Sequence, residues 1–327
     1  MSVNLRCRWR PALAAALLLF SSLLIAERPA TACSMCRCGD PTFNALGTDV
    51  YAMDKLRVAL DWERFDKEQG PADAAETINE DRYTTSISYT FSDRVTAVAR
   101  IPYSSRTLRE PEEPEIIESS VVKHGDHETP TRDSTSELAD PELYTLVRLW
   151  SSPFSGGMGS RAWISALGGV KTNWGRNDLR EGGIRLDEHL QPGTGSTDVF
   201  AGLSGFYLMD LNSSLFGSVQ LRRMGRNDFG YRYGDVTMAT AGYERKITTA
   251  LDGILTLDFR DAGRDLAGDE GTDPDTGGRL LYVTPKLSFD FGRGLVGRLA
   301  VQVPVVEDLN GDQDEKAVVN LGVTWLY

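Results

Sequence analysis

Three cysteines stand within six residues in the segment TACSMCRCGDPTF, at Cys33, Cys36 and Cys38. Thiolates at this spacing can share one soft ion, either Cu(I) or Zn(II), and Asp40 would supply a fourth ligand. Two other uses fit the same residues. Cys33 and Cys36 can close a disulfide in an oxidising compartment, or Cys33 can carry a lipid. Covalent haem is excluded because Arg37 stands where the attachment motif needs histidine.

Histidine is scarce in this chain, with three residues in total. His124 and His127 lie three apart in HGDHE and could bind a metal only if a third ligand joined them; polar loop residues are the other interpretation. His189 is the remaining candidate base. A membrane lipase would need a serine beside a histidine, and the sequence offers no convincing pair. We therefore expect no enzymatic activity.

The N-terminus has the pattern of an export signal. A basic stretch precedes the apolar run PALAAALLLFSSLLIA and small residues follow it, which predicts a signal peptide over 1–32. Cleavage there would make Cys33 the first mature residue. We then expect a cysteine-containing segment over 33–54, in the periplasm or as a plug in a pore, followed by a barrel over 55–327.

From Lys55 onward apolar residues alternate with polar ones. In LRVALDWERF, Leu56, Val58 and Leu60 share one face and Arg57 and Asp61 the other, which is a strand pattern. About twelve such runs of roughly 10–15 residues occur, longer than the ~5–6 of ordinary strands and long enough for the ~9–11 that a membrane needs. The fold class predicted is all-β, a transmembrane antiparallel β-barrel. After the first three runs, the others fall at about 141–151, 160–175, 196–208, 213–225, 233–247, 250–261, 278–290, 293–305 and 315–327.

The connections between these runs alternate in length. Outer-membrane barrels have short periplasmic turns and longer outer loops. The segments SDR, SPFSGGMG, MDLNS, TT and GRG would be the short turns. The longer loops would be 67–80, 106–140, 175–196, 225–233, 261–278 and 305–315. The pattern predicts the outer membrane of a Gram-negative bacterium as the location.

The last run, AVVNLGVTWLY, ends at an aromatic residue. Leu321, Val323, Trp325 and Tyr327 share its apolar face, and a terminal strand of this kind is the signal read by the barrel assembly machinery. The alternative is an edge strand of a soluble sandwich, which would expose a long apolar stripe.

The faces opposite the apolar stripes carry charged and amide residues that would line a lumen. A barrel of twelve strands is expected to hold a narrow or plugged pore. Two interpretations stay open: a cationic constriction that favours small anions, or a ladder of Arg and Asp pairs that braces the wall. The predicted lumen residues are Arg57, Asp61, Arg100, Lys171, Gln220, Arg222, Asp258, Arg260, Lys286, Arg298 and Gln302.

The chain is acidic, with a formal net charge of −12, which disfavours nucleic acid as a partner. Acidic residues gather in the predicted outer loops at 109–118, 265–275 and 307–315. Solvation of loops is the simple explanation; divalent cations joining these loops to lipopolysaccharide are the functional one. Membrane lipid, lipopolysaccharide and a small solute are the partners expected.

Several segments, in order, resemble a known family. FSDRVTAVARIPY, ADPELYTLVRLW, LGGVKTNWGRND, HLQPGTGSTDVFAGLSGFY and VQVPVVEDLNGDQ are similar to blocks of outer-membrane barrels described as phenol meta-pathway or generic transporter proteins. The CxxCxCGDPT start resembles a subset of them. The resemblance implies a monomeric or weakly associating barrel with a transport role and no catalytic residues, and it does not fix a substrate. The leading function predicted is passive passage of a small solute across the outer membrane. The rival hypothesis is a non-conducting barrel that presents its cysteine segment for metal binding or redox contact with a periplasmic partner.

Overall fold

The computed structural model describes residues 56–69, 76–109, 134–153, 160–181, 183–186, 188–268, 271–311 and 313–327. Strands dominate these ranges, and no helix within them is long and apolar enough to cross a membrane. Twelve long strands form the barrel: β1 (Leu56–Gln69), β2 (Glu76–Ser92), β3 (Val95–Arg109), β5 (Glu142–Pro153), β6 (Ser160–Lys171), β9 (Asp198–Asp210), β10 (Ser213–Arg223), β12 (Val236–Lys246), β13 (Leu251–Ala262), β15 (Gly278–Gly292), β16 (Leu295–Leu309) and β18 (Val318–Leu326).

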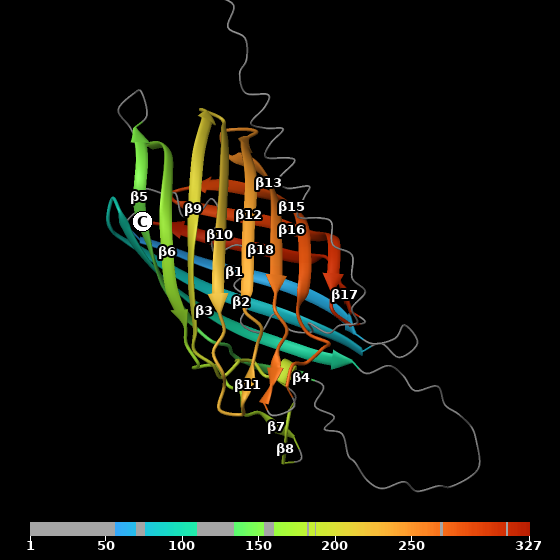
Figure 1. Cartoon of the computed structure of the whole chain (residues 1–327). Coiled ribbons are helices and arrows are strands. Elements are labelled where there is room, and N and C mark those ends of the chain that lie inside the picture. The colour runs from blue at the N-terminus through green and yellow to red at the C-terminus, as the bar shows by residue number, and fades with distance from the viewer. Residues whose placement is uncertain are drawn as a thin grey trace, which may run out of the picture. The chain divides into compact units, whose positions relative to one another are not determined.

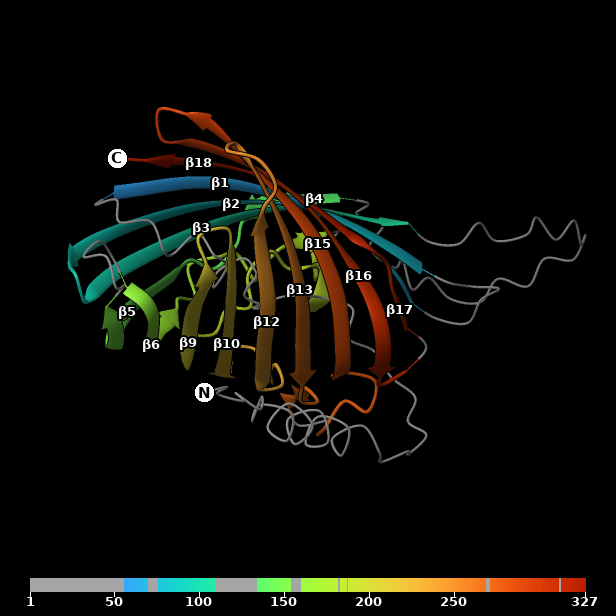
Figure 2. The same cartoon turned by 90° about the horizontal axis from the view of Figure 1, so that it is seen from above.

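The twelve strands close into one antiparallel barrel. Each pairs with the strands before and after it in the chain, and β1 pairs with both β2 and β18, so the sheet has no free edge (Figures 1 and 2). The pairing of β1 with β18 that closes the barrel extends from Arg57 opposite Leu326 to Arg64 opposite Val319. The predicted fold class and strand number are confirmed.

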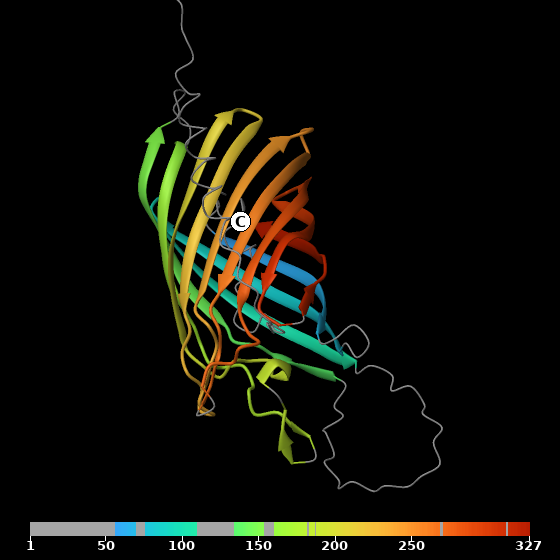
Figure 3. The same cartoon turned by 45° about the vertical axis from the view of Figure 1, so that its right-hand side comes forward.

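Shorter elements extend the barrel at one end. β4 (Ser134–Leu138) continues beside β3, and β17 (Gln313–Glu315) beside β1. The paired pieces β7 (Arg180–Glu181) with β8 (Ile184–Arg185), β11 (Tyr231–Arg232) with β14 (Leu266–Ala267), and the 3-10 helix η3 (Glu188–Leu190) belong to connections at the same end (Figures 1 and 3). We call this end the loop end and the opposite one the turn end.

Neighbouring residues on a strand face opposite sides of the wall. Leu60 is 48% exposed, whereas Ala59 and Asp61 beside it are 4% and 8% exposed. The apolar residues of the sequence pattern are thus the outward ones, and the polar residues between them are buried inside the barrel. Such an outer face would be costly in water and suits hydrocarbon.

Large aromatic side chains stand on the outer face near the turn end. Phe91, Phe291, Trp325 and Tyr327 are all more than 40% exposed. Aromatic girdles at the level of the lipid head groups are typical of membrane barrels. The outer face therefore has both the apolar band and an aromatic boundary of a membrane-spanning wall.

The connections differ in part from the expected lengths. The predicted loop 67–80 was wrong, because β1 and β2 stay paired from Leu56 opposite Tyr89 to Gln69 opposite Glu76. Similarly, β3 and β16 run further into the predicted loops, to Arg109 and Leu309. Strand pairing there continues beyond the predicted ends of the runs. The connection between β1 and β2 is therefore shorter than the predicted loop.

Gly169 permits a close approach between three strands. It pairs with Tyr144 on β5 and Phe200 on β9. A Cβ at this position would lie 2.8 Å from Cζ of Phe200 and would overlap Cβ of Tyr144 and the carbonyl oxygen of Leu143. The Phe200 ring therefore lies along the wall, over the space that the missing side chain leaves.

We expect Gly169→Ala to lower the free energy of unfolding by about 1–3 kcal/mol, the usual cost of overpacking. Gly168→Ala is the matched control, since its Cβ would meet only the carbonyl oxygen of Phe200 at 3.9 Å. The measurement is the urea midpoint in detergent, followed by the mobility of folded and unfolded protein on unheated gels. Equal midpoints for the two variants would contradict the packing described.

Candidate functional site

The inner face of the barrel carries the residues predicted to line a lumen. Eight of them are buried: Asp61, Arg100, Lys171, Gln220, Arg222, Asp258, Arg260 and Gln302. The other three, Arg57, Lys286 and Arg298, are half-buried. A buried charge needs a partner of opposite charge and further hydrogen bonds. The inner charges accordingly form groups that join strands far apart in the sequence.

One group links β3, β5 and β10 through a single carboxylate. Glu142 accepts a hydrogen bond from Arg100 Nη1 at 3.0 Å and another from Arg222 Nη2 at 2.6 Å. The Arg222 guanidinium also lies over the Phe200 ring, 4.7 Å from its centroid. Two guanidinium groups share one carboxylate here, so the group keeps one net positive charge.

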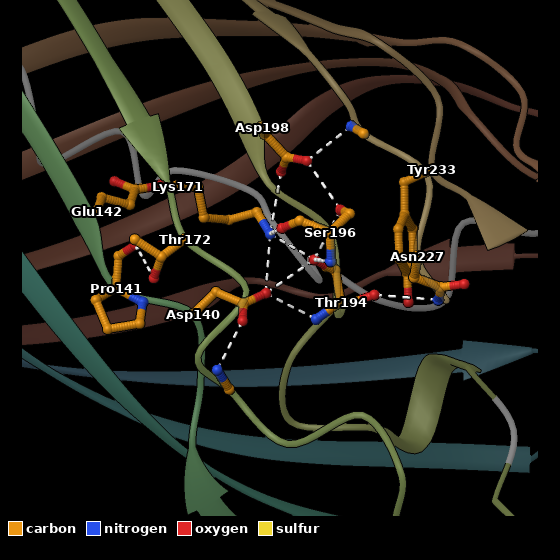
Figure 4. A network of polar contacts seen from close by, with 12 residues as sticks. Asp140, Pro141, Glu142, Lys171, Thr172, Thr194, Ser196, Asp198, Asn227 and Tyr233 are labelled. Atoms are coloured by element: carbon orange, nitrogen blue, oxygen red, sulfur yellow. Dashed lines mark hydrogen bonds and ion pairs between the residues drawn. The ribbon is translucent and has the colours of Figure 1, made fainter. Parts of the chain in front are cut away.

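Lys171 is the centre of a second group, at the loop-end edge of β6. Its Nζ lies 2.8 Å from Asp140 Oδ2 and 3.1 Å from Asp198 Oδ2, and donates to the carbonyl oxygen of Ser196 at 2.9 Å and to Thr194 Oγ1 (Figure 4). Asp140 also accepts bonds from the backbone nitrogens of Thr194 and Gly175, both at 2.8 Å. Lys171 therefore fixes both ends of the connection between β6 and β9.

A third group holds the middle of that connection against β3. Glu80 accepts hydrogen bonds from Arg82, Ser104 and Arg106. Arg106 in turn donates to the carbonyl oxygens of Gln191 at 2.5 Å and His189 at 3.1 Å. The chain around η3 is therefore tied to β3 by a buried guanidinium.

The same connection is held from the other side by the β10–β12 connection. Tyr233 Oη donates to the carbonyl oxygen of Glu188 at 3.1 Å, and Asn227 Nδ2 to that of Thr194 at 3.1 Å. The His189 ring packs edge-on against the rings of Tyr231 and Tyr233. Four barrel strands separate β3 from β12, so residues 188–196 extend over the loop end between two distant parts of the wall.

Asp265 supports this arrangement from the β13–β14 connection. It accepts hydrogen bonds from Tyr231 Oη at 2.6 Å and from the backbone nitrogen of Gly234 at 2.7 Å. Burial raises the pKa of Asp265, and these two donors and the charge of His189 act in the opposite direction. The carboxyl thus tolerates burial because its oxygens are bonded.

Asp258 lies on the wall formed by β12, β13 and β15. Its carboxylate accepts bonds from the hydroxyls of Thr240 at 2.9 Å and of Thr256 and Thr284, both at 2.7 Å. Further round, Arg298 Nη2 lies 2.6 Å from Asp61 Oδ1. The same wall also has an apolar part at the loop end, where Val236, Met238, Ala262, Leu280 and Tyr282 pack together.

The opposite wall carries an apolar surface that the sequence analysis missed. Val98, Tyr144, Leu146, Leu167 and Phe200 form a buried cluster on β3, β5, β6 and β9. Nearer the turn end, Trp163, Phe206 and Phe216 pair directly across β6, β9 and β10. Phe206 and Tyr207 are adjacent in the sequence, and neighbours on a strand face opposite sides of the wall. The sequence therefore already indicated that one of these two rings points into the lumen.

Several predicted residues lie outside the described part of the chain. These are Cys33, Cys36, Cys38 and Asp40, together with His124 and His127 and the segments 1–32 and 33–54. Among the described residues no group of three His, Cys, Asp or Glu side chains could hold a metal ion.

The predicted assembly residues lie on the closing strand β18 or, in the case of Tyr327, directly after it. Leu321, Trp325 and Tyr327 are exposed on the outer face, and Val323 is half-buried. Trp325 stands opposite Val58 on β1 and Leu295 on β16. The C-terminal strand is therefore the one that meets the first strand of the barrel.

Comparison of the sequence with protein-family models and with curated proteins found no match. Among solved structures, an outer membrane channel from Pseudomonas putida F1 is similar with a TM-score of 0.61 and 11% identity, covering 86% of this chain and 99% of that one. The translocator domain of the autotransporter NalP from Neisseria meningitidis gives a TM-score of 0.43 at 12% identity, covering 97% and 98% of the two chains. The toluene transporter TodX from Pseudomonas putida gives a TM-score of 0.44 at 10% identity, covering 86% of this chain and 91% of that one.

These observations define the class of protein. Twelve antiparallel strands in a closed ladder, with an apolar outer face and a charged inner face, make a transmembrane β-barrel. At 11% identity the likeness to the Pseudomonas putida F1 channel concerns the fold alone, and that fold is an outer-membrane β-barrel.

We expect Lys171→Met to lower the free energy of unfolding by about 3–5 kcal/mol, because it leaves two buried carboxylates without their cation. Lys246→Met is the control, since Lys246 is exposed at the turn end of β12. The urea midpoint in detergent measures the effect. A Lys171→Met variant as stable as the Lys246→Met variant would contradict the structural role of the Lys171 group.

Proposed function

We propose that the chain is a channel of the Gram-negative outer membrane through which a small solute passes passively. The single observation that carries this proposal is the closed barrel with a charged inner face and an apolar outer face. An outer face of this kind suits lipid, and an inner face of this kind suits a polar passage. The turn end would face the periplasm and the loop end the exterior.

The resemblance quoted above supports a narrower assignment, to the barrels described as phenol meta-pathway or transporter proteins. We also infer that Leu321, Val323, Trp325 and Tyr327 form the signal for the barrel assembly machinery. Lipopolysaccharide is the proposed partner of the acidic loop end. Passive passage needs no catalytic residue, so the chain would not be an enzyme.

The charge groups favour a modest preference for anions. Glu142 is shared by two guanidinium groups, and so is Glu80. Each of these groups keeps one positive charge, and the Lys171 group, with two carboxylates, keeps one negative charge. Lys286, half-buried on β15, adds a cation that makes no ion pair among the described residues. The ion pairs brace the wall, and the positive charge that remains at the Glu142 and Glu80 groups and at Lys286 is partly offset by the buried acids Asp258 and Glu63.

Conductance in planar bilayers tests this proposal. We expect ion-conducting channels whose reversal potential under a KCl gradient favours chloride. Lys286→Gln should lower the chloride-to-potassium permeability ratio about twofold, the effect of one partly screened charge. Arg279→Gln is the matched control, because Arg279 lies exposed on the same strand and pairs with Asp261. A correctly folded barrel that stays silent would overturn the channel function.

The three cysteines carry the alternative function. Their spacing supports a site for Cu or Zn at Cys33, Cys36 and Cys38, with a disulfide or a lipid on Cys33 as the competing states. Mass spectrometry of the mature N-terminus separates these states by a retained metal, a loss of two hydrogens or an added acyl chain.

Deletion of residues 33–43 then decides between the functions. Unchanged conductance with a fall in metal or redox tolerance would favour the alternative. A rise in conductance would instead identify the segment as a plug, and would leave the channel proposal standing.

A further inference from the structure

The aromatic row of the inner face is continuous across three strands. Trp163 on β6 pairs with Phe206 on β9, and Phe206 pairs with Phe216 on β10. The Trp163 and Phe206 rings stack at 5.9 Å with an angle of 15° between their planes. Arg148 on β5 lies over the Trp163 ring, 5.7 Å from its centroid. The result is one apolar surface with a cation at its edge.

Glycine lets this surface lie flat. Phe216 pairs with Gly242 on β12, and a Cβ at Gly242 would overlap three carbons of the Phe216 ring. The ring therefore lies along the wall over β12. It widens the aromatic row to the breadth of four strands and narrows the lumen less than an upright ring would.

Three cations stand on the opposite wall at the same end. Arg57, Lys286 and Arg298 lie on β1, β15 and β16. Each of these cations, and each ring of the aromatic row, lies within six residues of the turn end of its own strand. In the closed order of strands, β16, β18 and β1 are across the barrel from β6, β9 and β10, and β15 lies between the two sets, three strands from β10 (Figure 2). We call Arg57, Lys286 and Arg298 the basic group.

The basic group is the accessible part of the inner charges. All three members are half-buried, as is Phe206, whereas Arg100, Lys171 and Arg222 are buried in ion pairs. Acidic neighbours are present, since Arg298 pairs with Asp61, and Lys286 lies within the electrostatic range of Asp258, Glu63 and Asp61. Three hydroxyl groups donate to Asp258, which satisfies its oxygens without cancelling its charge, so these acids partly offset the basic group.

We propose that the turn-end half of the lumen is a selectivity site for small organic anions that carry a flat apolar group, such as an aromatic carboxylate. The apolar group lies on the aromatic row, and the carboxylate is directed to the basic group across the lumen. This inference rests on the proposed channel function and adds the class of solute to it. Of the three rings, Phe206 is half-buried and Trp163 and Phe216 are 6% and 7% exposed, so Phe206 is the ring that a solute would contact.

The physical reason is the difference between the two walls. A ring on an aromatic surface gains from burial and from the geometry of aromatic pairs, and a carboxylate gains from guanidinium and ammonium groups. A solute that has both parts binds better than one that has either. Acetate has the carboxylate of benzoate without its ring, so this pair of anions isolates the contribution of the aromatic row.

The test is the block of chloride current by added benzoate or acetate in planar bilayers. We expect benzoate to reduce the current at concentrations at which acetate does not. Phe206→Ala should weaken the benzoate block about fivefold, which corresponds to roughly 1 kcal/mol of aromatic contact. Tyr207→Ala is the matched control, because Tyr207 follows on the same strand and is 43% exposed on the outer face. Heat-modifiable gel mobility checks that each variant is folded.

Each result has a defined meaning. Equal block by benzoate and acetate in a conducting barrel would overturn the selectivity site and leave the channel function intact, whereas a silent barrel would overturn the channel itself. Benzoate block that is unchanged in Phe206→Ala would also overturn the site. The site would also be overturned if benzoate blocked the current only after deletion of residues 33–54, because the aromatic row would then be covered in the full chain.

Discussion

Closure of the hydrogen-bonded ladder between β1 and β18 is the constraint on which the whole structure depends. A strand edge inside a membrane would leave backbone amides and carbonyls without partners, at a cost of several kcal/mol for each group. Pairing from Arg57 opposite Leu326 to Arg64 opposite Val319 removes both edges at once. Once the ring is closed, every residue must face either lipid or the lumen, and the two solvents set the composition of the two faces.

The inner face is subject to a second constraint, because charged side chains buried inside the barrel need partners of opposite charge. The charges do not form a simple ladder of neighbours. Glu142 joins β5 to β3 and β10, and Lys171 holds Asp140 and Asp198 from the two sides of β6. Such groups fix both the wall and the connection at 188–196, because removal of one member leaves the others buried and unpaired.

Much of the fold could be predicted from the sequence because alternation is a local property. Leu56, Val58 and Leu60 against Arg57 and Asp61 already define a strand with one apolar face, and the length of such runs indicates a membrane. The loop boundaries could not be predicted in the same way. Between 67 and 80 polar residues stay in the ladder, where pairing with a neighbouring strand counts for more than the apolar pattern.

The sequence by itself determined the strands, their outward stripes and the polar character of the inner positions, since period-two alternation depends only on strand geometry. The tertiary structure alone decided which inner residues meet. Trp163, Phe206 and Phe216 come from three separate strands, and only the register of the closed barrel sets them in one row opposite Arg57, Lys286 and Arg298. Partners more than a hundred residues apart along the chain, such as Asp61 and Arg298, are brought together by the register and by closure of the ring.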